Sequence, residues 1–342
     1  MGLTVSGKEL GLLLRRAHVG AFKGATGLPI AKRFLFTQGR ILGSSGSVCA
    51  SIPFPQWTLP DASVDGALLE KVVKSLDGDL EIEVDRVFKV RCGKASVSLP
   101  LQEPHAEFYP TVQGAWVPIP RQFPSLVSAC AFANRTDYAG VAIRKVDGGS
   151  VIVGTDQSKI YYSLLPESLP ESWLSVDAAL ALAAVGDEGE AVSADDMWVH
   201  VKYTDGTIFS ALTMQAADYP VQDLYAYTQL FQGAEGDVCG EFTPEMCDAV
   251  KQASIFAGGA SGRKLVSFEY SGKSLRIAAE GAGGSYSCEM GWDGGDVDFA
   301  VTIDAQFLIT AKPQQLKLTT ANGLTVLLVP GDVSALVALD VL

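Results

Sequence analysis

Three copies of one short pattern divide this chain into similar parts. They occupy residues 63–69 (SVDGALL), 175–181 (SVDAALA) and 302–308 (TIDAQFL). Each copy predicts the start of a helix, because a Ser, Thr or Asp can cap the first backbone N–H groups and apolar residues follow at helical spacing. A pattern that returns at similar intervals indicates a duplicated structural unit.

The segments around each copy repeat as well. Apolar and polar residues alternate after the predicted helices, as in 80–84 (LEIEV) and 198–203 (WVHVKY), and this alternation predicts β-strands. Another amphipathic helix is expected near the start of each unit, at 8–20, 120–134 and 243–256. The units recur at roughly 110 to 125 residues, a normal domain size.

We therefore expect an α+β protein of three tandem domains, each with two helices against antiparallel sheets. The expected boundaries are 1–115, 116–232 and 233–342. Two of the three units end in matching tails, at 106–110 (AEFYP) and 216–220 (AADYP).

The composition excludes several classes of protein. Hydrophobic residues make up 48% and charged residues 19% of the chain, which is typical of a globular protein. No run of about 18 apolar residues occurs, and Lys8 and Glu9 interrupt the region where a signal peptide needs an apolar core. Six scattered cysteines without a CxxC motif indicate reduced thiols. We expect a soluble cytoplasmic protein without membrane contact.

The formal net charge of −13 at first argues against nucleic acid as a partner, because phosphate binding depends on Lys and Arg. The sum over the whole chain does not show where the charges lie. An acidic protein can still hold its basic residues on one face.

Motifs that would indicate an enzyme are incomplete. Residues 272–274 (GKS) resemble the end of a phosphate-binding loop, but Ser267 stands where that pattern needs glycine, so we predict a tight β-turn. The acidic residues at 187–190 and 195–196 are expected in solvated turns. The three histidines have no metal-binding spacing: His18, His105 and His200. We expect no catalytic residues, metal or cofactor.

Six stretches follow one another in the order of one known family: 28–30 (LPI), 68–73 (LLEKVV), 108–110 (FYP), 153–160 (VGTDQSKI), 217–220 (ADYP) and 249–256 (AVKQASIF). Together they resemble the bacterial DNA polymerase III beta subunit, the DNA sliding clamp. The fourth stretch is similar to that family's ATDGHRL strand and turn, the fifth to its DFPD linker, and the sixth to its helix ending in AAIL. The resemblance covers nearly the whole chain.

The chain departs from the family pattern in places. It is somewhat shorter than the usual member, residues 44–47 (SSGS) stand where a TD turn is expected, and Gln157 and Ser158 replace Gly-His. Such divergence suggests a clamp from a phage or mobile element. The sequence leaves the polymerase and the clamp loader unidentified.

The resemblance implies a non-enzymatic processivity factor. It would be a homodimeric ring of six domains that encircles double-stranded DNA without reading its sequence. It would tether the DNA polymerase, and meet the clamp loader, through a short apolar peptide motif of each partner.

In this family the helices line the hole, which implies a set of DNA-binding cations there: Lys8, Arg15, Arg16, Lys23, Lys71, Lys74, Arg121, Arg135, Lys251, Arg263, Lys264 and Lys312. Alignment with this family also implies a peptide-binding pocket formed by seven residues: Tyr138, Thr155, Ile160, Leu224, Leu230, Val337 and Leu339. The subunit interface is carried onto Val97 and Leu99 of an edge strand and onto Ile255 and Phe256.

A different class of protein also fits a threefold repeat. Virion and scaffold proteins contain duplicated α+β domains, and a fold does not determine a function. Basic residues on helical segments, set against acidic strands, favour the clamp.

Overall fold

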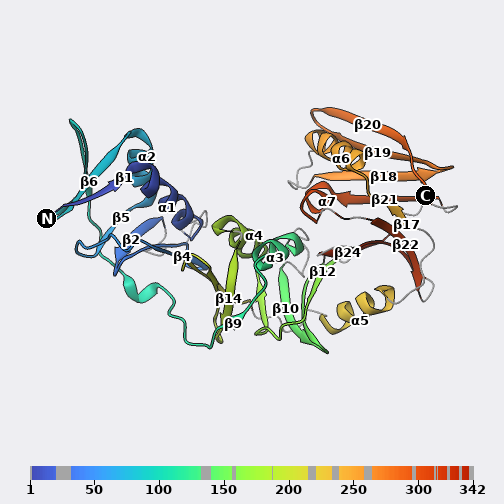
Figure 1. Ribbon diagram of the computed structural model, residues 1–342, viewed down its shortest axis with the longest axis horizontal. Helices are drawn as coiled ribbons and strands as arrows, with labels where there is room; N and C mark the ends of the chain where they lie inside the picture. Colours follow the sequence, from blue (N-terminus) through green and yellow to red (C-terminus); the bar gives the residue numbers. More distant parts are fainter. Residues whose placement is uncertain are drawn as a thin grey trace. The chain divides into compact units, whose positions relative to one another are not determined.

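The computed structural model describes most of the chain (Figure 1). The described residues are 2–20, 32–131, 140–155, 159–186, 188–214, 221–232, 239–257, 264–294, 298–311, 313, 315–321, 324–330 and 333–338. They form two compact units, Met1–Ser125 with Leu169–Gln215 (unit 1) and Leu126–Ser168 with Ala216–Leu342 (unit 2).

One order of elements occurs three times in the described residues: a strand, a helix, four strands, a helix and three strands. The first series is β1 (Leu3–Ser6), α1 (Gly7–Gly20), β2 (Arg33–Thr37), β3 (Arg40–Ser44), β4 (Val48–Pro53), β5 (Ala62–Asp65), α2 (Gly66–Ser75), β6 (Asp79–Val84), β7 (Val87–Cys92) and β8 (Ala95–Pro100). The 3-10 helix η1 (Ala106–Phe108) follows it.

The second series is β9 (Val117–Pro118), α3 (Phe123–Cys130), β10 (Val141–Val146), β11 (Gly149–Thr155), β12 (Lys159–Leu165), β13 (Ser172–Leu174), α4 (Val176–Val185), β14 (Gly189–Ala194), β15 (Trp198–Tyr203) and β16 (Ile208–Leu212). The third, which follows helix α5 (Val221–Gln232), is β17 (Cys239–Glu241), α6 (Pro244–Phe256), β18 (Leu265–Ser271), β19 (Ser274–Gly281), β20 (Gly284–Gly291), β21 (Phe299–Asp304), α7 (Ala305–Ala311), β22 (Gln315–Ala321), β23 (Leu324–Val329) and β24 (Ser334–Ala338).

The helix starts predicted from the repeat are confirmed, with one difference between copies. The Asp65 carboxylate accepts from the Leu68 N–H at 2.7 Å and caps α2, whereas the Ser175 hydroxyl accepts from the Ala178 N–H at 3.2 Å and caps α4. Ser63, which aligns with Ser175, lies in strand β5 instead. Helix α4 therefore begins two residues earlier in its copy of the repeat than α2 does.

Unit 1 contains two antiparallel sheets. The larger has the order β5-β2-β3-β4-β16-β15-β14-β9, so β4 of the first series pairs directly with β16 of the second. The smaller has the order β1-β6-β7-β8. Four aromatic side chains are buried together in the core of this unit: Phe36, Phe54, Trp57 and Phe88.

Unit 2 repeats this arrangement. Seven of its strands run in the order β10-β11-β12-β24-β23-β22-β17, so β12 of the second series pairs with β24 of the third. Its second sheet has the order β20-β19-β18-β21. The buried Trp292 joins the two, because its Nε1–H donates to the Glu241 carbonyl at 2.9 Å while its ring packs edge-on against Tyr270 of β18.

The tight turn predicted after strand β18 is confirmed. Residues 272–274 form the tight turn between β18 and β19, with positive φ angles of 56° at Gly272 and 69° at Lys273. No group of three or more His, Cys, Asp or Glu side chains that could hold a metal occurs in the described ranges. No described helix is long and apolar enough to cross a membrane.

Candidate nucleic-acid interface

Helix α1 has a buried side and an exposed side. Leu10, Leu14 and Ala17 are fully buried in the core of unit 1, as the helical spacing of apolar residues requires. Lys8 and Arg15 are exposed on the other side. The helix contacts α2, α4, β3 and β4, so packing within unit 1 determines where these two cations lie.

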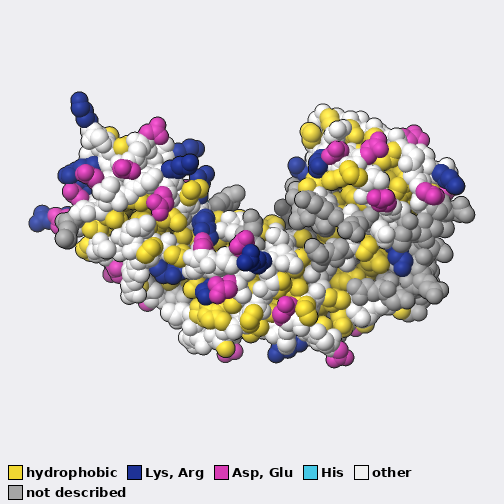
Figure 2. Space-filling model, in the orientation of Figure 1, with side chains coloured by type: hydrophobic (Ala, Val, Ile, Leu, Met, Phe, Trp, Pro, Cys, Tyr) yellow, Lys and Arg dark blue, Asp and Glu magenta, His cyan; other side chains and the backbone are white. Residues whose placement is uncertain are grey.

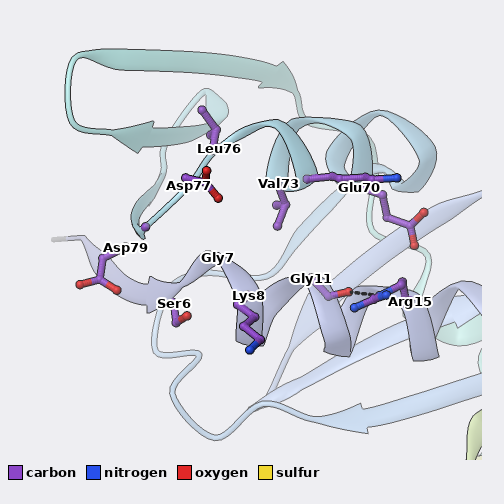
Figure 3. A pocket seen from close by; sticks show the side chains of 12 residues that line it. Ser6, Gly7, Lys8, Gly11, Arg15, Glu70, Val73, Leu76, Asp77 and Asp79 are labelled. Atoms are coloured by element: carbon purple, nitrogen blue, oxygen red, sulfur yellow. Dashed lines mark hydrogen bonds between the residues drawn. The ribbon is translucent and has the colours of Figure 1, made fainter.

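A cavity of about 640 Å³ lies between α1 and α2 (Figure 3). Glycines make the approach of the two segments close: the Gly7 N–H donates to the Gly78 carbonyl at 2.9 Å, and a Cβ on Gly11 would lie 3.6 Å from Val73. Twelve residues line the cavity: Ser6, Gly7, Lys8, Gly11, Arg15, Glu70, Val73, Lys74, Leu76, Asp77, Gly78 and Asp79.

Three of the predicted DNA-binding cations meet in this cavity, namely Lys8, Arg15 and Lys74. The Arg15 Nε–H donates to the Gly11 carbonyl at 3.3 Å. The two terminal guanidinium nitrogens take no part in that hydrogen bond. Glu70 lies at the same end, and its carboxylate is 2.7 Å from His18 Nδ1. Lys71 is exposed on α2, and Figure 2 shows Lys and Arg side chains gathered over α1 and α2.

Arg16 does not share this exposed position. Its side chain donates to the Val185 carbonyl at 2.9 Å and to the Thr207 hydroxyl at 3.0 Å, and forms an ion pair with Asp205. Burial opposes ionisation of Asp205, but hydrogen bonds from Arg16 and Thr207 hold the pKa of this carboxyl below its usual value. Arg16 thus joins α1 to α4 and to the β15–β16 turn, and its predicted role in DNA binding stays a prediction.

The remaining predicted cations are spread over the chain. Arg121 is exposed near Glu188, at 3.9 Å, and Lys251 is paired with Asp248 at 2.8 Å. Lys264 is exposed directly before β18. Four others lie outside the described residues: Lys23, Arg135, Arg263 and Lys312.

The predicted peptide pocket falls on strands and a helix of unit 2. Thr155 pairs with Ile160 across β11 and β12, and Ile160 pairs with Leu336 of β24. Helix α5 contacts β11 and β22 and contains Leu224, which is buried, and Leu230, which is half-buried. Tyr138 and Leu339 lie outside the described residues.

Strand register corrects one residue of this pocket. Directly opposed residues in a sheet point to the same face, and the next residue along points to the other. Leu336, opposite Ile160, therefore shares a face with Thr155 and Ile160, while Val337 points to the other face. We therefore take Leu336 as the pocket residue of β24 in place of Val337.

Two of the predicted interface residues lie in the edge strand β8, and two lie at the end of helix α6. β8 pairs only with β7, and within it Val97 is half-buried and Leu99 buried. β20 pairs only with β19 at the edge of its sheet. On α6, Ile255 is 75% exposed, and Phe256 stacks on Tyr286 of β20 with ring centroids 6.3 Å apart.

A row of buried polar side chains crosses the large sheet of unit 1. Neighbouring strands bring together five directly opposed residues in succession: Ser44, Cys49, Ser210, His200 and Ser193. Ser44 Oγ is 3.0 Å from Cys49 Sγ, and burial raises the pKa of the Cys49 thiol to about 12. We call this set the polar row. No sequence motif indicated it, because its members are distant in the chain.

His200 is the titratable centre of the polar row. Its Nδ1 is 2.8 Å from Ser210 Oγ and its Nε2 is 3.5 Å from the Asp195 carboxylate. Because a carboxylate only accepts, Nε2 donates to Asp195 and Nδ1 of the neutral ring accepts from Ser210. Burial lowers the pKa of His200, and the hydrogen bond to Asp195 opposes this only in part.

Stability should therefore fall in mild acid. The unfolded chain takes up a proton near pH 6.5 whereas folded His200 resists it, so the contribution of His200 is complete above pH 6.5 and is lost as the pH falls towards the folded pKa. One such group gives at most about 1.4 kcal/mol per pH unit. Denaturant unfolding between pH 7.5 and about pH 5 should show a flatter profile for His200→Gln than for the wild type. Parallel profiles would contradict this.

Comparison with known proteins identifies the fold. No protein-family model matches the sequence, and no curated protein is significantly similar to it. Solved structures do match it along its full length. The DNA polymerase sliding clamp from Bacillus subtilis has a TM-score of 0.73 at 14% identity, with 100% of this chain and 99% of that chain covered.

Two further structures have the same arrangement. The DNA polymerase III subunit beta from Pseudomonas aeruginosa has a TM-score of 0.71 at 16% identity, and the Helicobacter pylori beta clamp bound to a DNA ligase peptide has one of 0.73 at 15% identity. Both chains are covered completely in each case. At these identities the similarity shows the fold: the chain is an α+β protein with the fold of the bacterial sliding clamps.

Proposed function

We propose that this protein is a DNA sliding clamp, a processivity factor that encircles double-stranded DNA and tethers the replicative polymerase. One observation carries the proposal: the threefold series of elements matches solved sliding clamps over their whole length. In this role it is an accessory subunit without catalytic activity, working in the cytoplasm. We infer that the three series form domains 1–115, 116–232 and 233–342, which would divide between β8 and β9 and between α5 and β17.

The pairing of strands between successive series supports ring closure. β4 pairs with β16 and β12 pairs with β24, so in both cases the fourth strand of one series pairs with the last strand of the next series. The fourth strand of the third series, β20, and the last strand of the first series, β8, remain at open sheet edges. An open edge is a ready partner for another strand. Pairing β20 of one subunit with β8 of another would close a two-fold, head-to-tail ring.

A low-resolution image tests this proposal. Electron microscopy of the purified protein should show closed rings with a central hole wide enough for duplex DNA. Particles without a hole, at concentrations where sedimentation shows a dimer, would contradict a clamp and favour a scaffold protein.

The partners of the ring would bind through the pocket beside α5. The corrected pocket combines Thr155, Ile160 and Leu336 of the sheet with Leu224 and Leu230 of the helix. The Helicobacter pylori clamp binds a DNA ligase peptide, which supports a peptide-binding role for this chain as well. A polymerase or a clamp loader would each present such a peptide.

A peptide of the Gln-x-x-Leu-Phe type should bind this pocket with micromolar affinity, because burial of two apolar anchors is offset by the cost of ordering an extended chain. Ile160→Ala removes part of the apolar surface and should weaken binding about tenfold. Leu164→Ala, at an exposed position on the same strand, is the matched control. Fluorescence anisotropy measures both, and equal affinities for the two variants would exclude Ile160 from the pocket.

A further inference from the structure

The cations on the helices of this chain are unevenly distributed. Helices α1 and α2 expose four of them: Lys8, Arg15, Lys71 and Lys74. Helices α3, α4 and α7 contain no Lys or Arg within their bounds. The single lysine of α6, Lys251, is paired with Asp248 at 2.8 Å.

Within unit 1 the contrast is between neighbouring helices. Helix α1 contacts both α2 and α4, and Figure 1 shows it between them. The exposed side of α4 consists of Asp177, Leu180 and Ala184, and Leu180 is 48% exposed. A polyanion that approaches these helices is therefore attracted by the cations of α1 and α2. It meets no cation on α4.

The spacing of the cations suits the backbone of one DNA strand. Lys8 and Arg15 are seven residues apart, so they lie about 10 Å apart along α1, which is about the rise of three base pairs. Lys74 borders the same cavity from α2. Three acidic residues line the cavity: Glu70, Asp77 and Asp79. They compete little with a phosphate near Arg15, because Glu70 is paired with His18 and the two aspartates lie toward the other end (Figure 3).

We propose that this clamp holds DNA on one side: the cleft between α1 and α2 binds the phosphate backbone, and the exposed side of α4, which has no Lys or Arg, does not hold it. This inference rests on the proposed function. It adds that the cations which hold the duplex belong to α1 and α2 of the first repeat. Helix α4 of the second repeat attracts the DNA phosphates little.

Two matched triple variants test the proposal, since each removes three positive charges. K8Q/R15Q/K74Q should lower the affinity for a short duplex and reduce the slope of log K against log salt by about 2.7, at about 0.9 for each phosphate contact. R121Q/K251Q/K264Q should reduce that slope by less than about 0.9. Fluorescence anisotropy over a series of salt concentrations measures the slopes, and circular dichroism checks folding.

A gain of charge provides an independent measurement. L180K/A184K places two lysines on α4 and should increase the slope by about 1.8, because the DNA then meets cations there. The control V87K/L164K adds two lysines at exposed strand positions and should change the slope by less than half as much.

The outcomes distinguish a failure of the one-sided DNA contact from a failure of the clamp function. Equal losses for the two triple variants, with a wild type that binds DNA, would overturn the one-sided contact and leave the clamp function standing. An α4 variant that behaves like its control would also overturn it. A wild type that binds no duplex even at low salt would instead contradict the clamp function itself.

Discussion

Two aspartates in place of Ile255 and Phe256 should leave the protein folded but monomeric. Ile255 is exposed in the single chain, and Phe256 packs on Tyr286 of the open strand β20. In the proposed ring this surface meets Val97 and the β8 edge of the second subunit. Two unpaired carboxylates buried there would cost several kcal/mol, enough to weaken association by a factor of a thousand or more. Sedimentation velocity over a range of concentrations measures the change.

The matched control also introduces two aspartates at exposed apolar positions. Leu164→Asp with Met197→Asp changes side chains that are 40% and 61% exposed and belong to none of β8, β20 and α6. This control should remain dimeric. A wild type that is already monomeric at tens of micromolar, or a control that dissociates equally, would argue against this interface.

Trp292→Ala should be the most destabilising single substitution proposed for unit 2. The Trp292 ring lies between two glycines so closely that a Cβ on Gly240 or Gly294 would fall within about 2 Å of ring atoms. It also packs against Tyr270 and Phe299. Loss of a large buried aromatic side chain costs about 3 to 5 kcal/mol, and here the Glu241 carbonyl also loses its donor.

Urea unfolding followed by far-ultraviolet circular dichroism measures this loss. Trp116→Ala is the control, because Trp116 is 36% exposed and its removal should cost about 1 kcal/mol or less. Similar shifts of the two midpoints would mean that Trp292 does not join the two sheets of unit 2.

The repeat predicted the class of fold because helix capping and helical spacing depend on residues that are close together in the sequence. The capping residues Asp65 and Ser175 satisfy backbone N–H groups within one turn of their own position, so their role is visible in the sequence. The expected helices at 8–20 and 243–256 correspond to α1 and α6 for the same reason, since helical spacing is a local property.

Long-range features could not be predicted in this way. The pairing of β4 with β16 joins residues about 160 positions apart, and no periodicity within either strand indicates it. The polar row depends on that pairing, so its members looked unrelated. The choice between Leu336 and Val337 has the same origin: either side chain could face the pocket, and only the register of β24 with β12 distinguishes them. The donors of Arg16 were likewise engaged by residues far along the chain.

The polar row also has a consequence for how the chain avoids misfolding. Three similar repeats carry similar strand edges, so β4 could in principle meet β24 instead of β16. At equivalent positions, however, the first joint pairs Cys49 with Ser210 and the second pairs Ile160 with Leu336. A swapped pairing would place the Cys49 thiol or the Ser210 hydroxyl against an aliphatic side chain. The two joints thus differ in the polarity of their paired side chains, and this difference favours the native partner of each strand edge.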